Sequence, residues 1–334
     1  MSAMPIRLPR IAIALGDPAG IGPEIALKAA LDPGVRALCT PVLVGDRGAL
    51  QMHAASCGLA PRIVGVQPEA LVGMALEANA VALIERRHFA PGELRLGQTS
   101  AASGRAILDA GETAIRAALA GHVDAVVAAP QTETAVKLAG VEFDGYPGFV
   151  ARITGVPEDD AFLMLCFDDT RIVHVTLHVG VRRALELMTT ERVERAIRAA
   201  GTALKRLGVA APRIAVSGLN PHASEGGMFG DDEARVISPA IERARAGGLA
   251  VEGPFGADTM FHKAGFDVFV VMLHDQGHVA AKALAPNRAA GMTIGTPVLF
   301  SSVAHGSALD IAGRNLAKPD AVIEAIRRLA LVQA

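Results

Sequence analysis

Tryptophan is absent from this chain and tyrosine occurs once, so aromatic residues make up only 4% of its 334 residues. Hydrophobic residues still reach 51%, which leaves alanine, valine, leucine and isoleucine to build the core. That composition suits parallel strands covered by helices on both faces. The length favours two domains, since one domain takes roughly 150 residues.

Cysteine, basic runs and long apolar stretches are also scarce. Cys39, Cys57 and Cys166 form no C-x-x-C pair, which argues against a disulfide framework and predicts reduced thiols. A net charge of −2 without a lysine or arginine run argues against nucleic acid as a partner. No apolar stretch is long enough for a membrane span, and no signal-peptide core precedes the first strand. We therefore expect a cytoplasmic protein with a small-molecule substrate.

Strand and helix patterns alternate along the chain, which predicts an α/β fold. The expected strands are residues 11–15, 41–44, 123–128, 161–165, 171–177, 214–217 and 267–273. The expected helices are residues 106–121, 190–207 with Thr190 as cap, about 232–246, and a last one from Pro319. Asp168-Asp169-Thr170 predicts a hairpin between two of these strands. Because no linker composition appears, the two domains either share a sheet or one is inserted in the other.

The first strand leads into Gly16-Asp17-Pro18-Ala19-Gly20-Ile21-Gly22-Pro23-Glu24. The third glycine of a dinucleotide fingerprint is missing, so the segment fails as G-x-G-x-x-G. A tight strand-to-helix turn explains its glycines equally well. Its place after the first strand still makes it a plausible wall of a ligand crevice.

Four of the ten histidines end apolar runs or follow them directly: His178, His222, His274 and His305. Ligands of open parallel sheets bind beyond the carboxyl ends of the strands, so this placement indicates a metal or acid–base site. His174 would share one strand face with His178, because side chains on a strand repeat every two residues. Each such histidine has a plainer alternative as a buried, hydrogen-bonded side chain.

The loops around two of these histidines are more specific. Residues 220–227 and 274–278 are polar and glycine-containing, which a purely structural histidine does not require. Three neutral imidazoles with one open position suit Zn²⁺ or another borderline divalent cation. Nearby, Asp258 and Asp275 would ligate, orient a histidine or cap a turn, and Lys282 would pair an anionic substrate or stay solvated. No G-x-S-x-G elbow or Walker loop is present.

Taken in chain order, five motifs resemble the 4-hydroxythreonine-4-phosphate dehydrogenase family of pyridoxine biosynthesis. They are residues 16–24, 220–227, Gly256-Ala257-Asp258-Thr259, His274-Asp275-Gln276-Gly277 and His305-Gly306-Ser307-Ala308. The resemblance implies an isocitrate/isopropylmalate-dehydrogenase-like fold with two α/β/α domains sharing a cleft. It also implies a homodimer, NAD and a divalent metal, with zinc the most fitting. We expect one discontinuous domain of residues 1–131 and 308–334, and a second of residues 132–307.

The same resemblance implies residue roles. His178, His222 and His274 would be the metal ligands, at a site on the subunit interface. Residues 305–313 look like the cofactor loop of β-decarboxylating dehydrogenases. The residues implied for NAD binding are His305, Gly306, Ser307, Ala308, Asp310 and Asn287.

This chain departs from the pyridoxine enzymes where those enzymes hold the substrate phosphate. It has Pro130-Gln131-Thr132-Glu133 in place of Pro-Ile-Asn-Lys, and Gly145-Tyr146-Pro147-Gly148 in place of Gly-His-Thr-Glu. Gly291 and Phe300 take the places of an asparagine and an arginine, and Lys282 is what remains of the anion site. A phosphate with about two negative charges needs several strong donors. We therefore expect a substrate without phosphate.

The sub-branch of terephthalate 1,2-cis-dihydrodiol dehydrogenases is similar to this chain in further segments. They are residues 133–135, 145–147, 162–165, 171–178, 284–287 and 301–303. The resemblance implies metal-dependent, NAD-linked oxidative decarboxylation of a cis-dihydrodiol carboxylate to protocatechuate. Asp258 and Asp275 would tune or orient the metal site, and Lys282 would pair a carboxylate or assist proton transfer. Tyr146, Thr132 and Glu133 would bind the substrate.

Three alternatives stay open from the sequence. The first alternative is a dehydrogenase whose substrate is 4-hydroxythreonine 4-phosphate or a sugar-acid phosphate such as D-threonate 4-phosphate. A second alternative is a non-redox phosphate acyltransferase on the same fold. A third is a binding protein without turnover.

Overall fold

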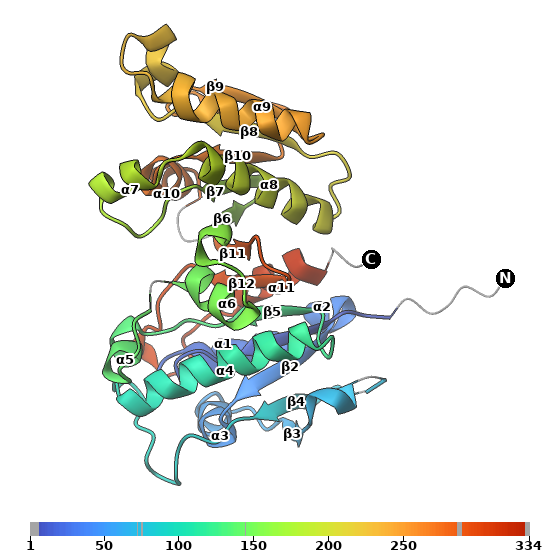
Figure 1. The fold of residues 1–334 in the computed structure, drawn as a ribbon. Coiled ribbons are helices and arrows are strands. Elements are labelled where there is room, and N and C mark those ends of the chain that lie inside the picture. Colours follow the sequence, from blue (N-terminus) through green and yellow to red (C-terminus); the bar gives the residue numbers. More distant parts are fainter. Residues whose placement is uncertain (1–6, 72, 75, 144, 286–288, 331–334) are drawn as a thin grey trace, which may run out of the picture. The chain divides into compact units, whose positions relative to one another are not determined.

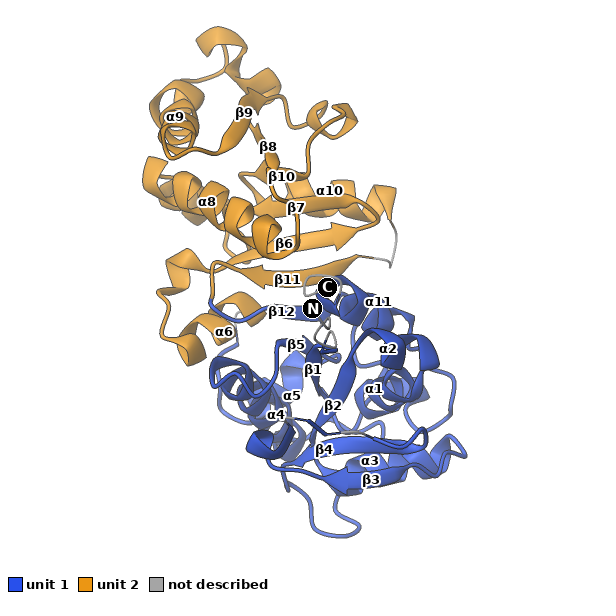
Figure 2. Ribbon diagram, turned by 90° about the vertical axis from the view of Figure 1, so that its right-hand side faces the viewer, with its two compact units in different colours: residues 1–143, 297–334 blue, residues 144–296 orange. Residues whose placement is uncertain are grey.

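The computed structural model describes residues 7–71, 73–74, 76–143, 145–285 and 289–330 (Figure 1). The chain divides into two compact units, residues 1–143 with 297–334 (unit 1) and residues 144–296 (unit 2) (Figure 2). The domain boundaries expected from the sequence stay a prediction, and the two units are described separately below.

Unit 1 holds a parallel sheet in the order β3-β4-β2-β1-β5-β12. Its strands are β1 (Arg10–Ala14), β2 (Thr40–Gly45), β3 (Arg62–Gly65), β4 (Ala80–Glu85), β5 (Ala125–Ala128) and β12 (Phe300–Val303). Its helices are α1 (Gly22–Leu31), α2 (Pro33–Leu38), α3 (Arg47–Ser56), α4 (Ala101–Leu119), α5 (Glu133–Leu138) and α11 (Asp320–Ala330).

Helices cover both faces of the sheet of unit 1. α4 lies on one face, while α1 and α11 lie on the other (Figure 2). All five residues of β1 and all four of β5 are buried. A strand between two helix layers has no solvent face, so it reads as a continuous apolar run without alternation. This explains how a chain with so few aromatic residues builds a dense core from alanine, valine and isoleucine.

Unit 2 holds a mixed sheet in the order β11-β6-β7-β10-β8-β9. Its strands are β6 (Phe162–Phe167), β7 (Thr170–His174), β8 (Arg213–Ser217), β9 (Ala250–Phe255), β10 (Val268–Val271) and β11 (Ala290–Ile294). Its helices are α6 (Tyr146–Thr154), α7 (Val181–Leu187), α8 (Thr190–Arg206), α9 (Ser238–Ala246) and α10 (His274–Leu284). α8 and α10 lie on opposite faces of this sheet (Figure 2).

The pairing in unit 2 places three strand ends together. β7, β10 and β8 are parallel neighbours, so their carboxyl ends lie at one edge of the sheet. The hairpin predicted around Asp168-Asp169-Thr170 is confirmed, since β6 and β7 pair antiparallel. Histidines from three separate parts of the sequence therefore follow the same sheet edge.

Three local predictions differ from the structure. β7 ends at His174. The amides of Val175 and Thr176 still donate to the carbonyls of Val271 and Met272, and the chain turns after them. His178 therefore lies beyond the strand and does not share its face with His174. β10 likewise ends at Val271, and His274 starts a helix instead of ending a strand. The hydroxyl of Thr189, not Thr190, caps α8 by accepting from the Arg192 amide at 3.2 Å.

The predicted α/β class is confirmed by both sheets. Among the described residues, no helix is both long and apolar enough to cross a membrane. Cys39, Cys57 and Cys166 form no disulfide among the described residues, and Cys39 and Cys166 are buried. Burial raises the pKa of the Cys39 thiol to about 12, so it stays protonated at neutral pH.

Candidate functional site

The carboxyl edge of the sheet in unit 2 brings imidazole rings together. His178 lies in the turn after β7, and His274 is the first residue of α10 after β10. Their ring centroids are 5.6 Å apart. These two are the sequence-predicted metal ligands that the structure places side by side.

Two further histidines join them. His274 and His278 are one helical turn apart on α10, and their rings stack at 3.8 Å with an interplanar angle of 9°. The ring of His174, at the end of β7, lies 4.7 Å from that of His278. Sequence reasoning assigned His278 no role, because the helix that starts at His274 was not predicted.

His174 is packed beneath α10. It is 1% exposed, and its Nε2 has no hydrogen-bond partner among the described residues. Gly277 makes this packing possible, since a Cβ there would lie 2.2 Å from that nitrogen. Burial lowers the pKa of His174 to about 3, and burial followed by the neighbouring His274 lowers that of His278 to about 4. Both rings are therefore neutral near pH 7.

Two further predicted site residues, the acid Asp275 and the base Lys282, also lie on α10. Nδ1 of His274 lies 2.6 Å from the Oδ1 of the exposed Asp275. An ionised carboxylate only accepts hydrogen bonds, so this contact puts the hydrogen on Nδ1. The lone pair of the neutral ring is then on Nε2, which is the nitrogen able to bind a cation. Lys282 is exposed two turns further along the same helix, and its charge contributes to the lowered pKa of His278.

His222 stands in a different local setting. It lies in a loop after β8 where six consecutive residues, 222–227, have positive φ angles. Its ring is 6.2 Å from Phe229, and its Nδ1 is 3.9 Å from Oδ2 of Asp258. Buried Glu233 anchors the start of this loop by accepting from the amides of Leu219 and Asn220.

The donor atoms are of the type that binds a borderline divalent cation. Their arrangement among the described residues, however, does not form a complete metal site. Neutral imidazoles suit zinc, and Asp275 supplies the outer partner that a ligating histidine commonly has. Within the part of the chain that the structure describes, however, no group of three or more His, Cys, Asp or Glu side chains is arranged to hold a metal ion. Two of the three predicted ligands are adjacent, and the third does not complete a set in this conformation.

The start of α6, which carries Tyr146, lies close to His178. Gly145 precedes α6 with φ 114°, and a Cβ there would lie 3.5 Å from Nδ1 of His178. The first turn of α6, which starts with Tyr146, therefore lies beside His178. The Tyr146 ring packs edge-on against Phe149, with centroids 6.4 Å apart, and burial raises the pKa of its hydroxyl. A protonated hydroxyl at this place is a hydrogen-bond donor.

The predicted cofactor loop lies in unit 1 and packs on the first glycine-rich loop. Ala308 adopts a left-handed conformation with φ 39° before the short turn of residues 309–311, which holds Asp310. The carbonyl of buried Ser307 accepts from the Ile21 amide at 2.9 Å, and a Cβ on Gly20 would meet that carbonyl at 2.6 Å. The loop starts with the half-buried His305 and the exposed Gly306. Asn287, also predicted to bind NAD, lies outside the described residues.

The predicted substrate residue Thr132 is hydrogen-bonded to the same glycine-rich loop. Asp17 is fully buried, bonds the side chain of Thr132 and accepts from the Ala19 amide at 2.9 Å. Burial raises the pKa of this carboxyl, and its hydrogen bonds oppose the rise. Glu133 follows Thr132 as the exposed first residue of α5. Thr132 and Glu133 thus lie at the carboxyl end of β5.

Sequence reasoning missed three buried ionisable side chains around this loop. Asp17, Glu24 and His53 are each 0% exposed, and one polar atom of each lacks a hydrogen-bond partner among the described residues. Nε2 of His53 lies 3.0 Å from the Pro18 carbonyl, and Glu24 binds Lys28 at 2.7 Å. The available signal was the pair of acids in a glycine- and proline-rich loop directly after a buried strand.

This chain is similar to known proteins over most of its length. The family model described as "Pyridoxal phosphate biosynthetic protein PdxA" matches residues 37–329. A 1,2-dihydroxy-3,5-cyclohexadiene-1,4-dicarboxylate dehydrogenase from Comamonas sp is 42% identical over 320 residues, covering 96% of both chains. A D-threonate 4-phosphate dehydrogenase from Cupriavidus necator is 38% identical over 337 residues, again covering 96% of both.

A solved structure is similar to this chain over nearly its whole length. The terephthalate 1,2-cis-dihydrodiol dehydrogenase from Burkholderia xenovorans is 42% identical, with a TM-score of 0.71 over 97% of this chain and 98% of the other. The family match spans most of the chain, and the relatives match it nearly end to end. This chain therefore belongs to the PdxA family.

Proposed function

We propose that this protein is a dehydrogenase that oxidises the cis-dihydrodiol of a ring dicarboxylate with NAD⁺ and releases CO₂. The substrate we propose is terephthalate 1,2-cis-dihydrodiol, and the products are protocatechuate, CO₂ and NADH. The proposal is supported by the names of two relatives that are each 42% identical to this chain.

The observation that carries the choice of substrate is Phe300. This residue starts β12 and is 0% exposed, so its place in the fold is filled by a hydrocarbon ring. Gly291, in β11, likewise offers no side-chain donor. A phosphate dianion needs several charged donors, whereas a carboxylate is satisfied by one cation and one or two hydrogen bonds. Lys282 and the hydroxyl of Tyr146 would supply those.

The reaction balances without any further oxidant. The C2 hydrogen leaves as hydride to NAD⁺ while the C2 hydroxyl loses its proton to a base. The resulting ketone lies β to the C1 carboxylate, which leaves as CO₂, and its electron pair forms an enolate. The enolate oxygen regains a proton, and the ring becomes aromatic. Lys282 would hold a carboxylate or assist proton transfer.

We also propose that His178, His222 and His274 hold a divalent cation, with zinc the best fit to imidazole donors. Such a cation would supply Lewis-acid stabilisation of negative charge on oxygen. The support is the adjacency of His178 and His274 and the exposed position of His222 beside Asp258. Residues 305–310 of unit 1 would bind NAD, and Asp258 would orient His222. We further propose a homodimer with the site at the subunit interface.

The test is NADH formation by the purified enzyme on three substrates given separately. They are the terephthalate cis-dihydrodiol, D-threonate 4-phosphate and 4-hydroxythreonine 4-phosphate. We expect turnover of the diol, with equal amounts of NADH, CO₂ and protocatechuate. Turnover of a phosphate ester alone would refute the substrate assignment. If no substrate yields NADH, the proposed dehydrogenase activity is wrong, and a non-redox acyltransferase or a binding protein is favoured instead.

A further inference from the structure

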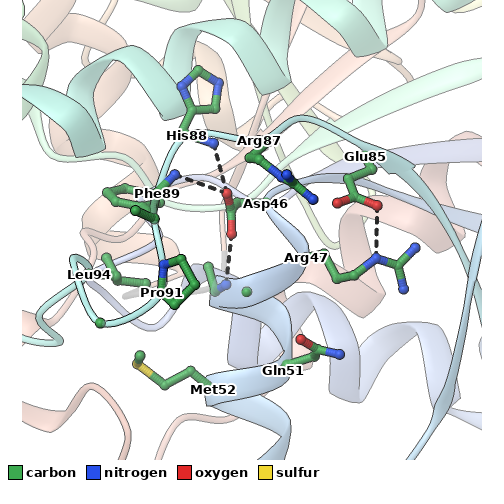
Figure 3. A pocket seen from close by; sticks show the side chains of 14 residues that line it. Asp46, Arg47, Gln51, Met52, Glu85, Arg87, His88, Phe89, Pro91 and Leu94 are labelled. Carbon is green, nitrogen blue, oxygen red and sulfur yellow. Dashed lines mark hydrogen bonds and ion pairs between the residues drawn. The ribbon is translucent and has the colours of Figure 1, made fainter.

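Unit 1 contains a cavity of about 720 Å³ beyond the carboxyl ends of β2 and β4 (Figure 3). It lies between the start of α3 and the loop of residues 87–94 that follows β4. None of the residues proposed above for metal, cofactor or substrate lines it. Pockets for small molecules in proteins measure about 300–1,000 Å³, so this cavity is large enough to hold one.

The lining is divided into an apolar side and a charged side. Phe89, Pro91, Leu94 and Met52 lie on one side of Asp46, and Arg87, Glu85 and Arg47 lie on the other (Figure 3). Leu94 is 6% exposed and belongs to a small core cluster that Phe89 packs against, so this wall is supported from behind. Met52 is 36% exposed at the mouth. Such an apolar wall suits a flat ring.

Asp46 holds the two walls in place and uses its carboxylate fully in doing so. Its Oδ1 accepts from the Ala49 amide at 2.9 Å and caps α3. Its Oδ2 accepts from the amides of His88 at 2.8 Å and Phe89 at 3.3 Å. The positive end of α3 is thus already occupied by an acid, so an anionic ligand must bind elsewhere in the cavity.

The charged side leaves one cation available. Nε of Arg47 bonds Oε2 of Glu85 at 2.8 Å, and a second nitrogen of Arg47 bonds the Ile63 carbonyl at 3.2 Å. His88 turns its Nε2 to Asp109, outside this cavity, at 2.7 Å. Arg87 is exposed and has no hydrogen bond or ion pair with any described residue. A free guanidinium is a bidentate donor for a carboxylate.

We propose that this cavity is a second small-molecule site, which binds a flat aromatic ring that carries one carboxylate. The ring lies against Phe89 and Met52, and the carboxylate pairs with Arg87. One unpaired guanidinium balances one negative charge, whereas a phosphate monoester brings about two. Its lining residues differ from those proposed for the active site, and Leu309 of the proposed cofactor loop packs in the same small core cluster as Leu94, behind the apolar wall.

The experiment is calorimetric titration of the full-length protein with naphthalene-2-carboxylate. We expect Arg87→Gln to weaken binding about tenfold or more, because it removes a hydrogen-bonded ion pair. Arg116→Gln is the matched control: it removes an exposed arginine of α4 in the same unit, which does not line the cavity. Met52→Glu places a carboxylate at the exposed mouth, and we expect it to weaken binding by a similar factor. The uncharged naphthalene-2-carboxamide should bind about tenfold more weakly than the acid.

Two further arms separate this site from others. The proposed active site would also accept an aromatic acid, so binding is measured in His178→Ala, which disrupts that site. We expect the affinity to be unchanged, because His178 does not line the cavity. Loss of binding in that variant, or equal binding to wild type and Arg87→Gln, would place the ligand elsewhere and overturn the proposal. Tighter binding of adenosine monophosphate than of the naphthoate would overturn the assignment to a monocarboxylate. Absence of binding by every probe would overturn the site itself.

Discussion

Single residues in this protein show how burial sets the state of a histidine. His53 and His174 are almost fully buried, and burial lowers the pKa of each. Exposed His178 and His222 have no such packing around them. The same residue type is therefore part of the core in one place and part of an exposed loop in another. From the sequence these cases look alike, because each histidine follows or interrupts an apolar segment.

We expect His178→Ala to lose bound divalent metal and to lower turnover about 1,000-fold, because Lewis-acid stabilisation contributes several kcal/mol. The measurements are metal content by mass spectrometry and NADH formation. His262→Ala is the control, since this exposed histidine belongs to the same unit and has no proposed role. Full metal content and turnover in His178→Ala would rule out this histidine as a ligand.

His53 should make unfolding depend on pH. Its pKa is lowered by burial in the folded chain, while in the unfolded chain it takes a proton near pH 6.5. The unfolded state therefore binds more protons below pH 6.5, and stability falls as the pH falls from there toward the folded pKa.

We expect His53→Gln to reduce that slope by up to one proton, about 1.4 kcal/mol per pH unit. Urea unfolding between pH 7 and pH 5 measures it. His262→Gln should keep the wild-type slope, because this side chain is exposed. Identical slopes for His53→Gln and wild type would show that His53 titrates normally when folded.

At the scale of elements, α10 does most to assemble the histidine cluster. It starts directly after β10 and carries His274, His278 and Lys282 on successive turns. Gln276 holds its first turn, where its Oε1 accepts from the amides of Met272 and Leu273 at 2.9 Å. Its Nε2 donates to the Gly218 carbonyl at 3.1 Å, which connects the helix start to the end of β8. The start of this helix, together with the end of β7, therefore determines which imidazoles meet.

Gly277→Ala should destabilise the protein, although alanine favours helix by about 1 kcal/mol. The new Cβ would lie 2.2 Å from Nε2 of His174 and 2.9 Å from a methyl carbon of Ile172, both in buried β7. We expect a net loss of about 1–3 kcal/mol in urea unfolding, as for other overpacked cores.

Gly180→Ala provides the contrast for this prediction. Gly180 has φ −60°, and a Cβ there meets nothing within 4 Å. We expect its stability to stay within about 1 kcal/mol of wild type. If Gly277→Ala is as stable as Gly180→Ala, the packing of α10 on His174 is looser than the structure shows.

At the scale of the whole molecule, the proposed homodimer bears on the metal site. His178 and His274 lie together within one chain, whereas His222 does not complete a metal-holding group among the described residues. A symmetric dimer offers a second copy of every loop, and one protomer then supplies what the other lacks. We therefore expect His222 to act on the histidine pair of the partner subunit.

Subunit complementation tests this arrangement. His178→Ala and His222→Ala should each be inactive, and co-refolded mixtures should regain about one quarter of wild-type turnover, since half of the dimers are mixed and each has one intact site. Sedimentation should show a particle of twice the 34.4 kDa chain. Two copies of the same inactive variant serve as the control. A mixture without activity would mean that one subunit provides all three ligands.

Local sequence patterns were sufficient for the α/β class, the buried parallel strands and the histidine-bearing loops, because alternation and apolar runs depend on neighbours in the chain. They also predicted the β6–β7 hairpin, which is closed by a short turn. Which histidines come together was decided by the tertiary structure. The end of β7 at His174 and the start of α10 at His274 depend on packing between distant segments, and the parallel order β7-β10-β8 brings their ends to one edge. A single-residue shift of a strand end or helix start redirects a side chain, and only the packed fold determines that position.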